Sequence, residues 1–216
     1  MKDIIMVGSG GCMRELVWQI QELNKLQPTW KIIGYVDCQA PENGIGVTVG
    51  NDRIPYLGTD DWLLESTEEK NIAICVGNAL MREKISKKLM QNPMLMFPNL
   101  ILKDSHICED VSMGKGCIVS MGAKISTNVA IGDFVFLNTD SMICHDGIIG
   151  DFVTLSPDSK LAGAVKVGNR CEIGMGAKVI QEISIGDDVI IGAGSVVVRD
   201  ITNKGTAVGV PARMIK

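Results

Sequence analysis

The chain has 216 residues, with 21 Lys and Arg against 25 Asp and Glu, which gives a formal net charge of -4 at pH 7. This acidic balance provides no basic surface for nucleic acid, and no segment offers the roughly 20 consecutive apolar residues of a membrane span, so we expect neither partner. Seven irregularly spaced cysteines, with no secretory signal pattern after Met1, predict free thiols and a cytoplasmic protein.

The first 97 residues alternate short apolar runs with segments of helical spacing. Asp3–Val7 is an apolar strand pattern that leads into a glycine turn, and helical spacing follows over residues 14–26. The further expected elements, in chain order, are strand 30–36, helix 60–64 with a cap near Thr59 or Asp60, strand 72–76, helix 78–90 and strand 94–97. This alternation predicts a small parallel α/β sheet of Rossmann-like type, in a domain of residues 1–97.

The turns that follow three of these strands should meet in one crevice, because ligands of such sheets bind at the carboxyl ends of the strands. These turns are 8–12, Asp37 and 77–78. Glycines at a helix start let backbone amides approach phosphate, so a bound nucleotide is one interpretation and a tight turn without ligand is the other. The third glycine of the dinucleotide fingerprint is Met13 here, which argues against an NAD(P) dehydrogenase. The glycine-rich segment 41–55 either covers the crevice or lies on the surface.

A six-residue repeat occupies the rest of the chain. Every sixth residue from Ile101 to Val197 is aliphatic, without a slip of register, and the fourth place after each is often small or branched, as at Cys117 and Ala123. This period predicts hexapeptide repeats wound into a parallel β-helix, in a domain of residues 98–216. We expect residues 205–216 and the α/β domain to cover the two ends of the coil.

The repeat also predicts which residues are neighbours in space. Three flat sides of six residues make one coil, so residues 18 apart stack on successive rungs at about 4.8 Å. His145, with Asp146 beside it, therefore lies one rung from Gly163, where no side chain obstructs a reacting carbonyl. Met175 stacks in the same way with Ala193, in two glycine-rich corners thin enough to admit a long, narrow ligand.

His145 is the candidate general base. A neighbouring carboxylate orients an imidazole and raises its basicity, whereas His106, at an entry rung, is better interpreted as structural or solvated. Two histidines are fewer than the three that hold zinc in the β-helical carbonic anhydrases, so we expect no metal. Cys144 occupies a position where the repeats place small residues, which argues against a nucleophilic thiol.

Four sequence segments together resemble one family, and the resemblance covers nearly the whole chain. They are VGSGGCMRELV at 7–17, LNTDSMICHDGIIGDFVTLSPDSKLAGAVKVG at 137–168, IGAGSVVVRDI at 191–201 and VGVPARMIK at 208–216. The chain is similar in these to the hexapeptide-repeat sugar acetyltransferases, the group of the sialic acid O-acetyltransferases and the bacillosamine-pathway UDP-amino-sugar N-acetyltransferases. This resemblance implies a left-handed β-helix, a homotrimer, and acetyl-CoA bound between neighbouring helices.

The resemblance also implies roles for individual residues. The catalytic positions are those of the base His145, its acidic partner Asp146, Gly163 with its amide at the thioester oxygen, and Asn138. Acetyl-CoA contacts correspond to Gly163, Met175, Ala193 and Thr154, and nucleotide-sugar contacts to Gly10, Gly11, Cys12, Asp37 and Gly77. The chain departs from the family pattern at Cys12 and Thr154, where relatives have histidine.

The function expected from sequence is therefore acetyl transfer from acetyl-CoA to a sugar, with His145 as base. The acceptor is expected to be a nucleotide-linked amino sugar that is N-acetylated for a surface glycan. Two alternatives stay open at this stage. One is O-acetylation of a sialic acid or another free sugar, and the other is a non-catalytic trimeric scaffold that binds a nucleotide-sugar.

Overall fold

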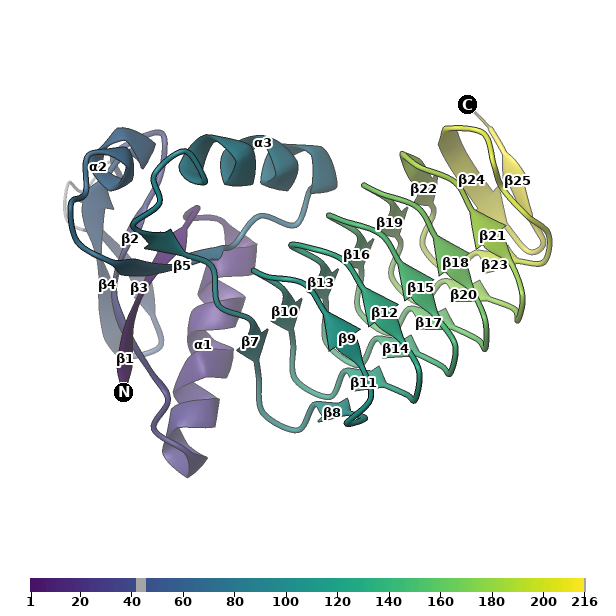
Figure 1. Ribbon diagram of the computed structural model, residues 1–216, viewed down its shortest axis with the longest axis horizontal. Helices are drawn as coiled ribbons and strands as arrows, with labels where there is room; N and C mark the ends of the chain where they lie inside the picture. Colours follow the sequence, from purple (N-terminus) through teal and green to yellow (C-terminus); the bar gives the residue numbers. More distant parts are fainter. Residues whose placement is uncertain (42–45, 216) are drawn as a thin grey trace. The chain divides into compact units, whose positions relative to one another are not determined.

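The computed structural model describes residues 1–41 and 46–215. The chain divides into two compact units, one made of residues 1–77 and 81–98 and the other of residues 78–80 and 99–216. The first is an α/β sheet and the second a parallel β-helix (Figure 1), which confirms the fold class expected from the sequence. None of the helices within the described ranges is long and apolar enough to cross a membrane.

The first unit is built on a six-stranded sheet of order β3-β4-β2-β1-β5-β6. All neighbouring strands are parallel except β3 and β4, which form an antiparallel hairpin. The strands are β1 (Lys2–Val7), β2 (Trp30–Val36), β3 (Gly46–Val49), β4 (Asp52–Gly58), β5 (Lys70–Ile74) and β6 (Leu95–Met96). The helices are α1 (Gly11–Leu26), α2 (Asp60–Leu64) and α3 (Ala79–Leu89).

The hairpin is the main difference between this sheet and the sequence-based prediction. Segment 41–55 was expected to be loop because it is rich in glycine, yet β3 and β4 pair from Gly46↔Pro55 to Val49↔Asp52. Gly50 lies in the tight turn between these strands with φ 59°, a backbone conformation that strains a residue with a side chain. Glycine therefore marks a hairpin turn here; residues 42–45 of the segment lie outside the described ranges.

The second unit is a coil with three flat faces, each a stack of short parallel strands (Figure 1). Face 1 contains β7 (Leu100–Ile101), β10 (Ile118–Val119), β13 (Phe136–Leu137), β16 (Thr154–Leu155), β19 (Glu172–Ile173) and β22 (Val189–Ile191). Face 2 contains β8 (His106–Ile107), β11 (Lys124–Ile125), β14 (Met142–Ile143), β17 (Lys160–Leu161), β20 (Lys178–Val179) and β23 (Val196–Val197). Face 3 contains β9 (Ser112–Met113), β12 (Ala130–Ile131), β15 (Ile148–Ile149), β18 (Lys166–Val167) and β21 (Ser184–Ile185).

The six-residue ladder is the core of this coil. From Val119 to Val197 every ladder residue is buried, at 6% exposure or less, whereas Ile101 at the first rung is 39% exposed. A buried aliphatic side chain contributes roughly 1.5 to 3 kcal/mol before chain ordering is subtracted, so repetition stabilises the coil. Pairing is in register throughout, as Leu137↔Leu155 and Ile143↔Leu161 show, which confirms the spacing of 18.

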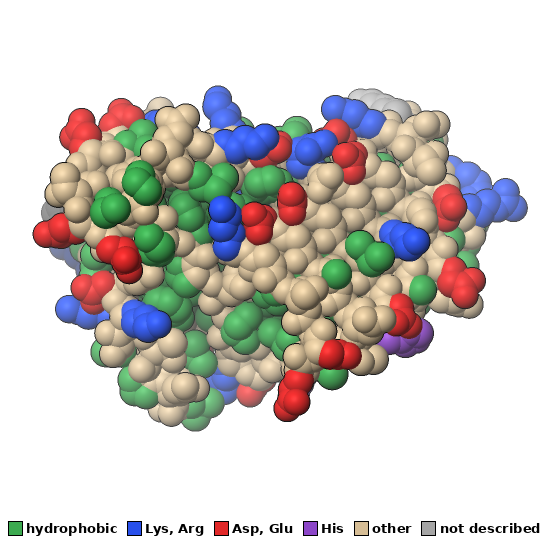
Figure 2. Space-filling view, in the orientation of Figure 1, with side chains coloured by type: hydrophobic (Ala, Val, Ile, Leu, Met, Phe, Trp, Pro, Cys, Tyr) green, Lys and Arg blue, Asp and Glu red, His purple; other side chains and the backbone are tan. Residues whose placement is uncertain are grey.

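The carboxyl end of the coil is closed by β24 (Gly205–Gly209) and β25 (Ala212–Met214). β24 continues face 1 in parallel with β22, and β25 turns back antiparallel to it. Ala207 and Ala212 from these strands pack into the coil's core cluster. The cap expected from the tail is therefore present over residues 205–215. On the surface of the coil, backbone and uncharged side chains are interspersed with both signs of charge (Figure 2).

Candidate active site

The candidate base lies on one edge of the coil, between faces 2 and 3. We call the corners that contain Thr127, His145 and Gly163 the His145 edge. Backbone hydrogen bonds between successive rungs fix this edge, since Asp146 N donates to Thr127 O (3.2 Å) and Ala164 N donates to His145 O (2.8 Å). Asp146 has φ 60°, a left-handed conformation that Asp tolerates better than most residues, and the sharp corner depends on it.

His145 and Asp146 form the pair predicted from their adjacency. His145 Nδ1 lies 2.7 Å from Asp146 Oδ2, and Asn128 Nδ2 donates to the other carboxylate oxygen, Oδ1, at 2.7 Å. The hydrogen bond from Asn128, followed by that from His145, lowers the pKa of Asp146 below its ordinary value. Because an ionised carboxylate only accepts, the proton of a neutral imidazole resides on Nδ1 and leaves the lone pair on Nε2.

Nε2 of His145 faces Gly163 on the next rung. A Cβ placed on Gly163 would lie 2.6 Å from Nε2, which is closer than a real Cβ approaches any atom, so only glycine leaves room for this ring. Gly163 O accepts from Glu182 N at 2.9 Å, while its amide N–H donates to no atom among the described residues. Nε2 of His145 and an amide that donates to no described residue therefore lie on neighbouring rungs of an exposed edge.

Two of the predicted acetyl-CoA contacts, Met175 and Ala193, lie on a different edge, between faces 1 and 2. We call the corners that contain Asn138, Met175 and Ala193 the Met175 edge. Gly194 N donates to Met175 O at 2.8 Å, which confirms the predicted stacking, and Met175 is 59% exposed. A Cβ on Gly176 would meet nothing within 4 Å, so the backbone here is open along one side.

Two predicted residues do not lie beside His145. Asn138 is on the Met175 edge, and its Oδ1 accepts from the backbone N of Thr139 at 2.8 Å. Thr154 is in β16 on face 1, with its side chain only 6% exposed. Apart from Thr154, the predicted catalytic and cofactor positions of one chain are thus divided between two edges, with face 2 between them.

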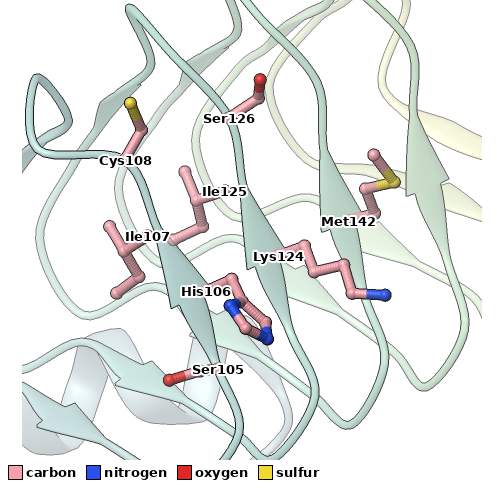
Figure 3. A pocket seen from close by; sticks show the side chains of 8 residues that line it. All are labelled: Ser105, His106, Ile107, Cys108, Lys124, Ile125, Ser126 and Met142. Atoms are coloured by element: carbon pink, nitrogen blue, oxygen red, sulfur yellow. The ribbon is translucent and has the colours of Figure 1, made fainter.

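The second histidine lies apart from this pair. His106 on β8 borders a shallow hollow of about 490 Å³ on face 2, which also includes Lys124 of β11 and Met142 of β14 (Figure 3). The ring is exposed and makes no hydrogen bond to the described residues, in agreement with the solvated role expected for it. His145 is therefore the histidine with an oriented ring.

A deep pocket in the first unit brings together the five predicted nucleotide-sugar positions. It encloses about 750 Å³ and is lined by the 8–12 turn, by Asp37 after β2, by 75–77 after β5 and by one side of α3. Gly10, Gly11, Cys12, Asp37 and Gly77 all line it. The crevice expected from strand topology is therefore present, and its size suits a nucleotide-sized ligand.

Two groups that line this pocket, Asp37 and Cys12, have different charge states. Burial raises the pKa of Asp37, but hydrogen bonds outweigh it: Ser9 Oγ donates to Oδ2 at 2.5 Å and Cys38 N to Oδ1 at 2.7 Å, so the net pKa lies below the ordinary value. Burial raises the pKa of the Cys12 thiol to about 12. Asp37 is thus an anionic acceptor, whereas Cys12 is a neutral thiol.

Two lysines of α3 line the pocket, and a buried arginine of the same helix fixes one of the pocket's turns, although no sequence pattern indicates these roles. Arg82 is 1% exposed, and its Nη1 donates to the carbonyls of Val76 and Gly77, both at 2.8 Å, which fixes the turn after β5. Lys84 and Lys88 line the pocket four residues apart on one helix face. Charged residues on a surface helix normally face solvent, so no sequence pattern distinguishes these three.

The two domains of the chain each match a family model, and together they are typical of a class of protein, the hexapeptide-repeat transferases with an α/β amino-terminal domain. Residues 3–89 match the PglD N-terminal domain, and residues 164–199 match the bacterial transferase hexapeptide (six repeats). No curated protein matches the sequence. The groups of three or more His, Cys, Asp or Glu that would hold a metal ion are absent from the described part of the chain.

Solved structures show which members of this class the chain resembles. The acetyltransferase domain of PglB from Neisseria gonorrhoeae, in complex with acetyl coenzyme A, is 28% identical with a TM-score of 0.87, and the match covers 99% of each chain. A mutant GDP-perosamine N-acetyltransferase from Caulobacter crescentus, in complex with CoA and GDP-perosamine, is 28% identical with a TM-score of 0.86, over 100% of this chain and 98% of that one. WeeI from Acinetobacter baumannii is 26% identical with a TM-score of 0.83, over 100% of both.

The chain is similar to the hexapeptide-repeat sugar acetyltransferases, because it has matches to both of their domains and matches their structures from end to end. This confirms the resemblance deduced from the four sequence segments and the acyltransferase class that it implied.

Proposed function

We propose that this protein transfers an acetyl group from acetyl-CoA to the amine of a nucleotide-linked sugar, in the synthesis of a surface glycan. The observation that carries the proposal is the His145 edge, where an imidazole held by Asp146 at 2.7 Å presents Nε2 beside the free amide of Gly163. Base and oxyanion donor side by side are what direct acyl transfer requires. The CoA and nucleotide-sugar complexes of the relatives support both substrates.

The proposed reaction is a single displacement. The sugar amine attacks the thioester carbonyl carbon, and His145 Nε2 takes the amine proton as the C–N bond forms. The amide N–H of Gly163 donates to the oxyanion that develops on the carbonyl oxygen. The C–S bond then breaks and CoA leaves as the thiolate, which the proton held by His145 can neutralise. Asp146, anionic because its pKa is lowered, stabilises the imidazolium that forms.

The proposed enzyme is a homotrimer, in which each site lies between two copies. The division of the site between two edges supports this arrangement: His145 and Gly163 are on one edge, while Met175, Ala193 and Asn138 are on the other. In a closed ring of identical subunits, the His145 edge of one copy meets the Met175 edge of the next. Acetyl-CoA would lie along this junction, with its thioester beside Gly163. Thr154 is buried on face 1, away from both edges.

The nucleotide-sugar is proposed to bind in the pocket of the first unit. Its floor is the glycine turn at the start of α1, where backbone amides are available for phosphate. Lys84 adds a cation with no ion pair among the described residues, whereas Lys88 is paired with Asp60 (3.5 Å) and Asp61 (3.1 Å). A pocket of this size favours a nucleotide-linked acceptor over a free sugar, which has no use for it.

A CoA-release assay with UDP-, GDP- and dTDP-linked amino sugars tests the proposal, with the matching free amino sugars and sialic acid as controls. We expect one nucleotide-linked amino sugar to support the release of CoA from acetyl-CoA, with one free amine consumed for each CoA released. Release with free sugars alone would overturn the assignment of the acceptor. No release with any acceptor, together with no thermal shift by millimolar acetyl-CoA, would instead favour a scaffold.

A further inference from the structure

A chain of hydrogen bonds continues from His145 down the coil, beyond the residues to which a role has been assigned. Asp146 accepts from His145 through one oxygen and from Asn128, one rung below, through the other. Asn128 in turn is held from the rung below it, where Asp110 Oδ2 accepts from the backbone N of Asn128 at 3.0 Å and from Thr127 Oγ1 at 2.5 Å. Three successive rungs are thus joined through side chains.

The conformation of Asn128 explains why its side chain reaches Asp146. Its φ is 53°, in the left-handed region where Asn is one of the few tolerated residues. With the backbone N fixed by Asp110, the carboxamide extends one rung along the edge and places Nδ2 2.7 Å from Asp146 Oδ1. The amide therefore sets the rotation of the carboxylate, and the carboxylate sets the rotation of the imidazole.

We propose that Asn128 is a positioning residue for the acetyl transfer, which holds Asp146 so that His145 keeps its proton on Nδ1 and its lone pair on Nε2. This inference rests on the proposed function of His145, but the measurement that mainly tests it, the tautomer of His145, does not require activity. The same hydrogen bond is the largest cause of the lowered pKa of Asp146.

The chemistry of the neighbourhood requires a neutral donor at this position. By register, Glu109 and Asp110 lie two rungs below the His145–Asp146 corner and Glu182 lies two rungs above it, so carboxylates surround it on both sides. An aspartate at position 128 would have the same shape and the same tolerance of φ 53°, but it would repel Asp146 and could not donate to it. Asparagine is therefore the residue that both fits the corner and orients the acid.

The chain contains a matched control. Asn169, on the edge between faces 3 and 1, also bonds to its 18-residue neighbours: its Oδ1 accepts from Asp151 N at 2.8 Å, and its backbone N donates to Asp187 Oδ1 at 2.7 Å. Like Asn128, Asn169 lies between acidic residues 18 positions before and after it, but no histidine lies beside any of these residues. Removal of this carboxamide should therefore affect stability alone.

The test is the tautomer of His145, measured in the full-length protein by 15N NMR of labelled histidine at a pH where the imidazole is neutral. The chain has two histidines, so His106 serves as the internal reference. We expect an Nδ1-protonated His145 in the wild type and in Asn169→Ala, and a shift toward the Nε2-protonated form in Asn128→Gly and Asn128→Asp. Gly is chosen because it tolerates φ 53°. If the glycine variant does not fold, Asn128→Asp tests the same hydrogen bond with a side chain of the same shape.

The kinetic expectation is a loss of about 10-fold in kcat for Asn128→Gly, with the KM for acetyl-CoA unchanged. In an Asp146→Ala background the same substitution should produce no further loss, because Asn128 acts only through that carboxylate. Unchanged tautomers in both Asn128 variants, or losses that simply add in the double variant, would overturn the proposal. If no acceptor is found, the tautomer shift still decides the role of Asn128 without activity.

Discussion

The two edges that border face 2 differ in what they present to solvent. The His145 edge presents side chains joined by hydrogen bonds through Asp146 and Asn128. The Met175 edge presents glycine-rich backbone, with Gly176 and Gly194 open on their outer side. One edge therefore presents an oriented imidazole, and the other presents open backbone.

The comparison shows how a uniform repeat can support a specific reaction. The inward ladder is the same at every rung, since it serves only burial, and the outward corners vary independently of it. A histidine at one corner and glycines at another do not alter the packing of the core. The coil fixes where these groups lie, and the residues at the corners determine what they do.

The largest expected effect comes from removal of the base. His145→Ala should lower kcat by about 10² to 10⁴, because the amine proton would have no acceptor in the transition state. The side chain is 60% exposed, so the melting temperature should stay within a few degrees of wild type. His106→Ala is the matched control, with expected wild-type kcat; near-full turnover by His145→Ala would place the base elsewhere.

A methyl group on the neighbouring rung should have the next largest effect. Gly163→Ala places a Cβ against the His145 ring, 2.6 Å from Nε2 before any shift, so the ring must rotate away from the carbonyl. Displacement of a catalytic group by about 1 Å lowers kcat on the order of 10²-fold. Steady-state kinetics of Gly163→Ala in the wild-type and His145→Ala backgrounds checks the cause. If the loss is equally large without the imidazole, the steric interpretation is wrong.

On the Met175 edge the effect should be on binding rather than on chemistry. Ala193→Trp fills the open strip next to Met175 and should raise the KM for acetyl-CoA by about 10-fold or more, because a bulky ring occupies the path of the ligand. The affinity for the nucleotide-sugar, measured by calorimetry, should not change. An unaltered KM for acetyl-CoA would mean that the ligand does not follow this edge.

The edge between faces 3 and 1 should contribute stability only. Arg170 Nε donates to Asp188 Oδ1 at 2.7 Å and Nη2 donates to Oδ2 at 3.1 Å, and these bonds lower the pKa of Asp188. Arg170→Gln should reduce the free energy of unfolding by about 1 kcal/mol at pH 7.

The sign of the pH dependence follows from the lowered pKa of Asp188. The folded state binds this proton less tightly than the unfolded state, so the stabilisation is present above the ordinary carboxyl pKa of about 4 and is lost as the pH falls through the folded value. The free energies of unfolding of Arg170→Gln and wild type, from denaturant titrations, should therefore begin to converge as the pH falls below about 4. A difference that is as large at pH 3 as at pH 7 would contradict the role of this pair.

Much of the fold could be predicted because it follows from periodicity. The 18-residue spacing gave the stacking of His145 with Gly163 and of Met175 with Ala193, and β2 and α2 have the bounds expected from their apolar patterns. The β3–β4 hairpin could not be predicted in this way, since β3 has only four residues and the glycines of the segment are typical of a loop. Thr59 begins α2 as expected, but its side chain makes no capping bond.

The candidate site was predictable only where adjacency in sequence fixes adjacency in space. His145 and Asp146 are neighbours in the chain, and residues 8–12, Asp37 and Gly77 meet because parallel strands end at one edge. Asn128 was missed because a link through an asparagine on another rung depends on a φ of 53°, which sequence does not reveal. Arg82 was missed because its burial depends on the tertiary structure around α3.

The shared site is tested most directly by mixing two variants that are each impaired in a different edge. His145→Ala lacks the proposed base but keeps an open Met175 edge. Ala193→Trp keeps the proposed base but has a blocked Met175 edge. If each site joins the two edges of neighbouring copies, subunits mixed in equal amounts and reassembled should recover about a quarter of wild-type activity at a low concentration of acetyl-CoA, because a quarter of the junctions combine two intact edges. Activity no greater than the average of the separate variants would contradict a site shared between copies.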